Sequence, residues 1–175
     1  MSYLVTHWQY FLIAITCYIW GSVPYGYLLT KLATGKNILN VGSGNIGSTN
    51  VRRVAGRKVS VITQLLDMIK GLAPVGIYLY LLSCRYTTTE YKLVYLIALA
   101  SILGHNFSIF LRFKGGKGVN TTLGATLLIA PYSVLIAVFS FFVIKALLKY
   151  VSAGSLTLAI MLPFSELILS GYSYT

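Results

Sequence analysis

Two short stretches of the sequence concentrate glycine, hydroxyl, amide and basic side chains, a mixture suited to binding phosphate. They are VGSGNIGSTNVRR, residues 41–53, and KGGKG, residues 114–118. Glycine lets a backbone approach a ligand closely, and successive N–H groups in glycine-rich turns bind anions. Arg52 and Arg53 can hold an oxyanion through paired hydrogen bonds. Residues 41–53 alone could equally be a flexible connection with basic topology signals, so residues 114–118 decide in favour of a site for two phosphates.

A dinucleotide site must be considered first, because Gly42, Gly44 and Gly47 match the spacing G-x-G-x-x-G. Asp67 follows twenty residues after Gly47, near where an acidic residue would bind a ribose. That fingerprint requires a strand before the glycines and a helix after them within a βαβ unit. Here the glycines follow a long apolar segment, and Asp67 lies inside another. The sequence therefore argues against a dinucleotide site, and KGGKG does not match a Walker A loop either.

The composition indicates an integral membrane protein. The chain of 175 residues is 57% hydrophobic and 10% charged, whereas soluble domains are typically about 25% charged. About 20 apolar residues cross a bilayer as a helix. The apolar segments are 9–31, 59–82, 93–111, two short or tilted helices within 119–149 separated at Ala130–Pro131, and 155–172. We therefore predict an all-α, polytopic integral membrane helix bundle of about six spans, forming a single domain over residues 1–175.

The distribution of charge predicts the orientation. Of the 14 Lys and Arg residues, six lie between residues 31 and 58 without an acid, and three lie between 112 and 117. The opposite side carries Arg85 and Lys92 with Glu90 between them. By the positive-inside rule, the N-terminus is outside and both glycine-rich loops are cytoplasmic. The net charge of +11 then reflects topology and attraction to anionic lipid or substrate, and no nucleic-acid-binding module is recognisable.

Other residues capable of chemistry give weaker signals. The two cysteines and two histidines form no ligand cluster, so we expect no metal, no disulfide and no cofactor. Residues 1–16 contain no Lys or Arg, so the first apolar segment is expected to be a retained span and not a cleaved signal. Asp67 and Lys70 share one helix face and are expected to form an inward-facing ion pair that anchors a loop. Glu166 is a lone acid in the last span.

Five motifs together resemble a known family. They are GSVPYGYL (21–28), GSGNIGSTNVRR (42–53), DMIKG (67–71), GHNFSIFLRFKGGKGV (104–119) and YVSAGS (150–155). In order and spacing, from about residue 19 to 156, they are similar to the bacterial acyl-phosphate:glycerol-3-phosphate acyltransferases of the PlsY type. The resemblance implies a multi-pass enzyme of the bacterial plasma (inner) membrane. It would transfer an acyl group from acyl phosphate to glycerol 3-phosphate, giving lysophosphatidic acid for phospholipid synthesis, with membrane lipid and no nucleic acid as a partner.

The resemblance also assigns site residues. Catalytic roles fall to Arg53, Lys117 and Ser155. The substrate- and phosphate-binding set is Gly42, Ser43, Gly44, Asn45, Thr49, Asn50, His105, Gly115 and Gly116, and the polar patch at 149–155, which begins the last apolar segment on the same side, adds Ser152. His105 is expected to serve mainly a structural role, because the acidic residue that follows the catalytic histidine of many acyltransferases by five positions is Phe110 here. Since acyl phosphate is already activated, we expect direct attack by the glycerol 1-hydroxyl, with a substrate phosphate as the candidate proton acceptor.

The chain departs from the family pattern at three places. Leu39 stands where the family usually has Arg, and Ser108 stands where it usually has Pro. The family also continues through a seventh span into a segment that supplies a His and an Asn, so this domain is expected to lack the last span. Two alternatives therefore remain open: a phosphate or organic-anion transporter, and a catalytically inactive relative. Transporters often contain inverted repeats, and no convincing repeat is present.

Overall fold

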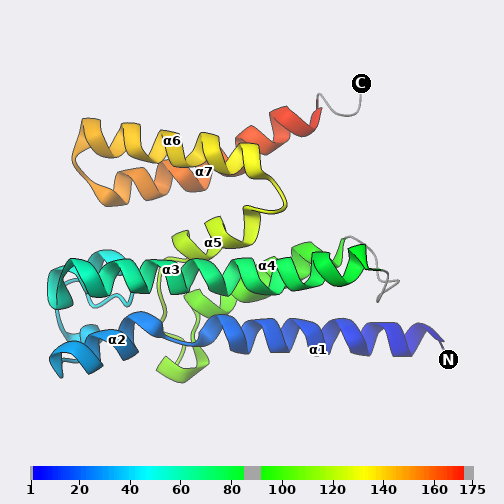
Figure 1. Ribbon diagram of the computed structural model, residues 1–175, viewed down its shortest axis with the longest axis horizontal. Helices are drawn as coiled ribbons and strands as arrows, with labels where there is room; N and C mark the ends of the chain where they lie inside the picture. Colours follow the sequence, from blue (N-terminus) through cyan, green and yellow to red (C-terminus); the bar gives the residue numbers. More distant parts are fainter. Residues whose placement is uncertain (1, 85–91, 172–175) are drawn as a thin grey trace. The chain divides into compact units, whose positions relative to one another are not determined.

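The computed structural model describes residues 2–84 and 92–171, which form helices joined by short loops (Figure 1). The helices are α1 (Ser2–Ser22), α2 (Tyr25–Thr34), η1 (Ile38–Asn40), α3 (Ser48–Ser83), α4 (Leu93–Asn106), η2 (Ile109–Leu111), α5 (Val119–Thr126), α6 (Pro131–Leu148) and α7 (Val151–Gly171). These residues contain no strand, so the predicted all-α membrane fold is confirmed. The chain forms two compact units, residues 1–125 and 126–175. The expectation of a single functional domain stays a prediction.

Five stretches of the described chain are long and apolar enough to cross a membrane, where about six were expected. They are Trp8–Thr34, Ser48–Ser83, Leu93–Leu111, Pro131–Leu148 and Val151–Ser170. The difference lies in residues 119–149, because α5 has 8 residues and reaches only about 12 Å. The expected break is present, since α6 begins at Pro131. The orientation stays a prediction, and Arg85 and Glu90 lie outside the described residues.

In the first unit, α1, α3 and α4 lie side by side, with α3 antiparallel to the other two (Figure 1). Glycines bring α1 and α4 into close contact. A Cβ added at Gly21 would overlap the backbone of Ser101, and one added at Gly104 would overlap the Tyr18 carbonyl. Such small-residue crossings are typical of membrane helices, which associate through close packing. The contact fixes the end of α4, which carries His105 into the site.

The first predicted span, 9–31, is interrupted between α1 and α2. Pro24 precedes α2 and cannot donate a backbone hydrogen bond to continue α1. A carbonyl at the buried end of α1 is satisfied from another segment, because the Ser108 hydroxyl donates to the Ser22 carbonyl at 2.5 Å. This bond also ties the loop after α4 to α1. Ser108, one of the departures from the family pattern, therefore has a structural role.

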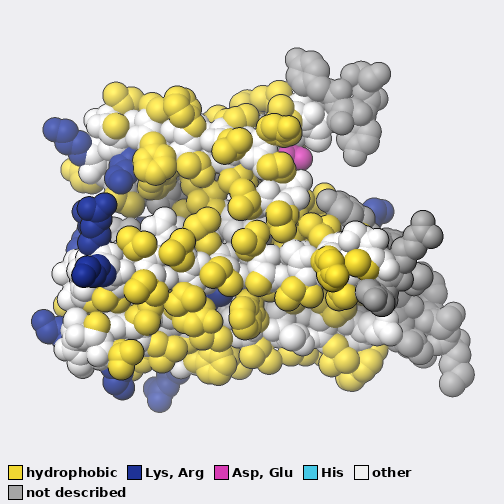
Figure 2. Space-filling view, in the orientation of Figure 1, with side chains coloured by type: hydrophobic (Ala, Val, Ile, Leu, Met, Phe, Trp, Pro, Cys, Tyr) yellow, Lys and Arg dark blue, Asp and Glu magenta, His cyan; other side chains and the backbone are white. Residues whose placement is uncertain are grey.

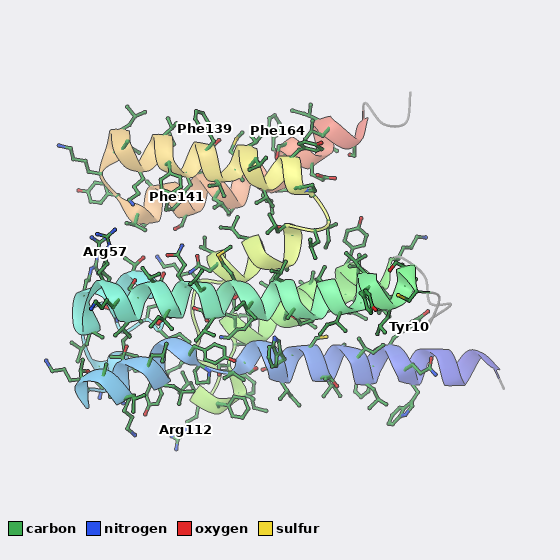
Figure 3. The ribbon with its side chains drawn as sticks, in the orientation of Figure 1. Tyr10, Arg57, Arg112, Phe139, Phe141 and Phe164 are labelled. Carbon is green, nitrogen blue, oxygen red and sulfur yellow. The ribbon has the colours of Figure 1, made fainter. Side chains whose placement is uncertain are left out.

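A sharp bend at Gly56 divides α3 into a short helix and a long one. Gly56 has φ 85° and ψ 178°, which is not helical and is readily available only to glycine. Beyond the bend, the Ser60 hydroxyl donates to the Ser48 carbonyl at 2.8 Å. In a straight helix these residues would be about 18 Å apart. Residues 48–55 therefore fold back against the start of the long segment, with Arg57 at the bend (Figure 3).

Apolar side chains cover most of the visible surface, as expected for a protein in contact with lipid (Figure 2). In the first unit, Lys and Arg side chains gather at the end where α2 stops and α3 starts (Figure 2). The second unit is an antiparallel hairpin of α6 and α7 (Figure 1). Within it, the Ser133 hydroxyl donates to Glu166 Oε2 at 2.6 Å. Glu166 therefore has a partner that the sequence did not indicate.

Candidate functional site

The first glycine-rich loop is built around the side chain of Asn50. Its Nδ2 donates to the carbonyls of Val41 at 3.0 Å and Asn45 at 2.9 Å, with the Ile38 carbonyl further away at 3.4 Å. Its Oδ1 accepts from the Ser43 N–H at 3.0 Å. Asn50 is only 2% exposed. This one side chain therefore fixes the path of the loop, and its predicted contact with substrate stays a prediction.

The glycines of this loop also help to fix its path around Asn50. Gly42 and Gly44 have φ angles of 65° and 67°, in the left-handed region that disfavours other residues. A Cβ added at Gly42 would also overlap Asn50 Oδ1. Asn45 Oδ1 accepts from the Gly47 N–H at 2.7 Å, a turn that leads directly into α3. The predicted binding residues Gly42, Gly44 and Asn45 thus shape the loop.

A small hydrophobic cluster packs against the first glycine-rich loop. Ile38, Ile46 and Val51 are buried there, and Leu39 and Leu111 pack against them. Leu39, which stands where the family usually has Arg, therefore lies on an apolar support. Leu111 belongs to η2, so the cluster also joins the loop to the segment that precedes residues 114–118.

The polar groups that remain accessible lie at the start of α3. Ser43, Thr49 and Arg53 are exposed, and α3 begins directly after Gly47, which provides no side-chain cap. The first N–H groups of a helix have no partner within the helix. Such N-termini bind phosphate through these N–H groups and the helix dipole. This end of α3 can therefore accept an anion with Arg53 nearby on the same short helix.

The second glycine-rich loop, residues 114–118, folds over the end of α4. The Gly116 N–H donates to the His105 carbonyl at 3.0 Å. A Cβ added at Gly115 would overlap the same carbonyl, and one added at Gly118, which has φ 72°, would overlap Asn106 Oδ1. These glycines therefore allow close packing, while Lys117 remains exposed. The predicted residues Gly115 and Gly116 form the support of the loop.

The structure brings the two loops together. Asn120 Nδ2, in the first turn of α5, donates to the Ser48 hydroxyl in the first turn of α3 at 3.3 Å. Each of these helices begins directly after a glycine-rich loop. The hydrogen bond between their first turns therefore places the two helix N-termini next to each other. The packing of Leu111 on the cluster under the first loop is a second connection. The arrangement places two helix N-termini in one region whose flanking segments carry the exposed Arg53 and Lys117.

A buried group of charged and aromatic side chains lies where α2, α3 and α4 meet. Lys70 Nζ is 3.0 Å from Asp67 Oδ1, which confirms the predicted inward-facing ion pair. His105 Nδ1 lies 3.4 Å from Lys70 Nζ and 3.5 Å from Asp67 Oδ1. The Lys70 ammonium also stands 5.0 Å from the centre of the Tyr25 ring, a cation–π distance. His105, predicted among the binding residues, is 4% exposed and faces this group.

Comparison with known proteins identifies the family. The family model described as glycerol-3-phosphate acyltransferase matches residues 11–174. The chain belongs to this family. A glycerol-3-phosphate acyltransferase of Clostridium acetobutylicum is 46% identical over 155 residues, which are 85% of this chain and 75% of the relative. Glycerol-3-phosphate acyltransferase 2 of Thermotoga maritima is 39% identical over 163 residues, which are 93% of this chain and 80% of the relative.

Two solved structures of the acyltransferase family share the fold. The crystal structure of PlsY (YgiH), an integral membrane glycerol 3-phosphate acyltransferase, in its glycerol 3-phosphate form has a TM-score of 0.80 and 34% identity. The match covers 92% of this chain and 78% of that chain. The lysophosphatidic acid form has a TM-score of 0.75 and 31% identity, covering 92% and 77%. The likeness supports a multi-pass membrane protein.

One residue of the candidate site, Asn120, carried no signal in the sequence. Asn120 and Ser48 are 72 positions apart, and only the fold shows that they meet. Ser152 and Ser155, predicted from the family resemblance, lie in the first turns of α7 in the second unit. The Ser155 hydroxyl donates to the Val151 carbonyl at 3.0 Å, while Ser152 is exposed. Their roles stay predictions.

Proposed function

We propose that this protein transfers an acyl group from acyl phosphate to the 1-hydroxyl of glycerol 3-phosphate. The product would be lysophosphatidic acid, made at the bacterial plasma membrane for phospholipid synthesis. Membership of the glycerol-3-phosphate acyltransferase family supports the acyl-transfer reaction and the acceptor. The solved relatives named for glycerol 3-phosphate and lysophosphatidic acid support the same substrate and product. Acyl phosphate as the donor rests on the motif resemblance and on the site chemistry below.

The hydrogen bond between Asn120 and Ser48 is the observation that carries the proposal. It joins the first turns of α5 and α3, so two helix N-termini and two glycine-rich loops serve one region. The reaction brings two phosphates together, one on glycerol 3-phosphate and one on the acyl donor. Helix N-termini and guanidinium or ammonium groups stabilise such anions. Arg53 and Lys117 are the exposed basic side chains that we assign to this task.

The reaction proposed for this site is a direct acyl transfer. The glycerol 1-hydroxyl oxygen forms a bond to the acyl carbonyl carbon, and the bond from that carbon to the phosphate oxygen breaks. The phosphate leaves with the electron pair, and the hydroxyl proton passes to a substrate phosphate oxygen. No strong protein base is required, because the acyl phosphate is already activated. The position of His105 is consistent with this scheme, because its ring is buried against Asp67 and Lys70.

The protein then contributes positioning and charge stabilisation. Holding the hydroxyl against the carbonyl makes the encounter effectively intramolecular, which can supply about 7–11 kcal/mol of the barrier. Donors directed at developing negative charge supply more, and removal of one costs about 2.7–4 kcal/mol in other acyl-transfer sites. Arg53, Lys117 and the loop N–H groups are the donors assigned to this role. The buried supports of both loops keep these donors in place before substrate arrives.

One assay with purified protein in liposomes tests both the reaction and its donor. Labelled glycerol 3-phosphate is supplied with palmitoyl phosphate, palmitoyl-CoA or palmitoyl acyl carrier protein in separate reactions. The proposal predicts labelled lysophosphatidate with palmitoyl phosphate alone. Product formed equally from palmitoyl-CoA would refute the donor assignment. Label that accumulates unchanged inside the liposomes would indicate a transporter. The absence of both labelled product and accumulated label would indicate an inactive relative.

A further inference from the structure

We propose that Asp67, Lys70 and His105 are positioning residues that hold the loop 114–118 in one conformation and thereby place Lys117. The family resemblance includes the DMIKG motif, but the proposed chemistry assigns no step to it. The order of the loop can be measured whether or not the protein is active. The kinetic consequence for acyl transfer rests on the proposed function.

The three side chains lie too deep to act on a substrate directly. Asp67 and Lys70 are each 1% exposed and His105 is 4% exposed. Lys70 Nζ is enclosed by Asp67 Oδ1 at 3.0 Å, His105 Nδ1 at 3.4 Å and the Tyr25 ring. Charged groups inside membrane helices are costly and are usually paired and functional. A buried ion pair is weak evidence of stability by itself, so we assign this pair a positioning role.

The His105 ring links this ion pair to the loop. Its Nδ1 edge faces Asp67 and Lys70, and its Nε2 edge faces Gly116. A Cβ added at Gly116 would overlap Nε2, so the loop backbone rests directly on the ring. The Gly116 N–H also donates to the His105 carbonyl at 3.0 Å. A ring released from the ion pair would therefore change the surface on which the residue before Lys117 lies.

The same segment of α3 packs against α5, the helix that follows the loop. Gly71 follows Lys70, and a Cβ added there would overlap the Thr121 carbonyl and lie 2.5 Å from the Ala125 backbone nitrogen. Both of these belong to α5, which begins directly after the loop. A Cβ at Gly124 would likewise overlap the Met68 carbonyl. Residues 67–71 thus support the middle of the loop through His105 and, by direct packing, the helix α5 that follows the loop.

A purely stabilising role makes a different prediction, and a double variant separates the two. Asp67→Asn with Lys70→Met removes both charges at similar volume and leaves no lone buried charge. Replacement of a buried ion pair in this way is often neutral for stability. We therefore expect the double variant to fold, to lose the fixed position of His105 and to gain motion in the loop. Either single variant would instead leave one buried charge unpaired and would be less stable.

The motion can be measured with a nitroxide attached to Lys114→Cys, an exposed position in the loop. The background replaces the two native cysteines, as Cys17→Ala and Cys84→Ser. Continuous-wave electron paramagnetic resonance should show an immobilised label in the parent and a faster component in the double variant. Ser101→Ala is the matched control, because Ser101 lies one turn before His105 and its buried hydroxyl donates to the Ile97 carbonyl within α4. This control should retain the parent spectrum.

A second variant keeps the test decisive should the double variant fail to fold. Gly116→Ala leaves both charges in place but pushes the loop off the His105 ring, so it should give the same faster component. An unchanged spectrum in either folded variant would overturn the proposal. In the active protein, the double variant should also lose about ten- to a hundredfold in kcat/KM, the range for a slightly displaced group. Loss of activity with an unchanged spectrum would refute loop positioning without touching the proposed function.

Discussion

Replacement of Asn50 by Asp is expected to disorder the first glycine-rich loop. The change removes the Nδ2 donor from the carbonyls of Val41 and Asn45, at 3.0 and 2.9 Å, and places a buried oxygen against them. Each lost hydrogen bond is worth about 1 kcal/mol, and each carbonyl left buried without a partner costs about 1–3 kcal/mol. With two carbonyls affected, we therefore expect a loss of roughly 2–6 kcal/mol in the stability of the loop. The accepted bond from the Ser43 N–H can persist.

The matched control is Asn37→Asp, the same chemical change in the segment that leads into this loop. Asn37 is exposed and its Oδ1 accepts from the Leu39 N–H at 3.0 Å, a role that a carboxylate can keep. Thermal unfolding in detergent and KM for glycerol 3-phosphate should both change in Asn50→Asp and stay near parent values in Asn37→Asp. If the two variants changed equally in unfolding temperature and in KM, the role of Asn50 in fixing the first glycine-rich loop would be refuted.

Further predictions concern the charges of the site and of the second unit. Arg53→Ala and Lys117→Ala should each lower kcat/KM at least tenfold, or about 1.4 kcal/mol, whereas exposed Lys58→Ala should change it little in the same assay. KM for glycerol 3-phosphate should rise as salt is increased from about 0.05 to 0.5 M, because the assigned basic groups are exposed and screened. A salt-independent KM would contradict that electrostatic role. Glu166→Gln should preserve the bond from Ser133, while Glu166→Leu should lower the thermal unfolding temperature by leaving that buried hydroxyl unpaired.

Local patterns in the sequence were sufficient to predict the membrane fold and the Asp67–Lys70 pair. Apolar length predicts spans, and i, i+3 spacing places two side chains on one helix face. Glycines beside Arg53 and Lys117 led to the prediction of phosphate binding, which required both loops and stays a prediction. These predictions need no information about which segments meet in space.

Features that depend on contacts between distant residues could not be predicted in this way. The bend at Gly56 lies in a basic stretch just before the apolar segment 59–82, and an isolated glycine does not by itself predict a bend. The bond from Asn120 to Ser48 and the contact of His105 with Lys70 join residues 72 and 35 positions apart. The use of Asn50 to close its loop likewise depends on the loop folding back over α3. Residue type and motif indicated that Asn50 and His105 matter, but not which residues they contact.

The central claim is that the two loops form one phosphate site, and calorimetric titration of glycerol 3-phosphate tests it most directly. The measurement would use the protein in lipid nanodiscs, with Arg53→Ala, Lys117→Ala and Lys58→Ala variants alongside. The account predicts saturable binding that weakens in each of the first two variants, remains in the third, and is absent for glycerol. Binding unaffected by loss of either Arg53 or Lys117 would contradict a shared site.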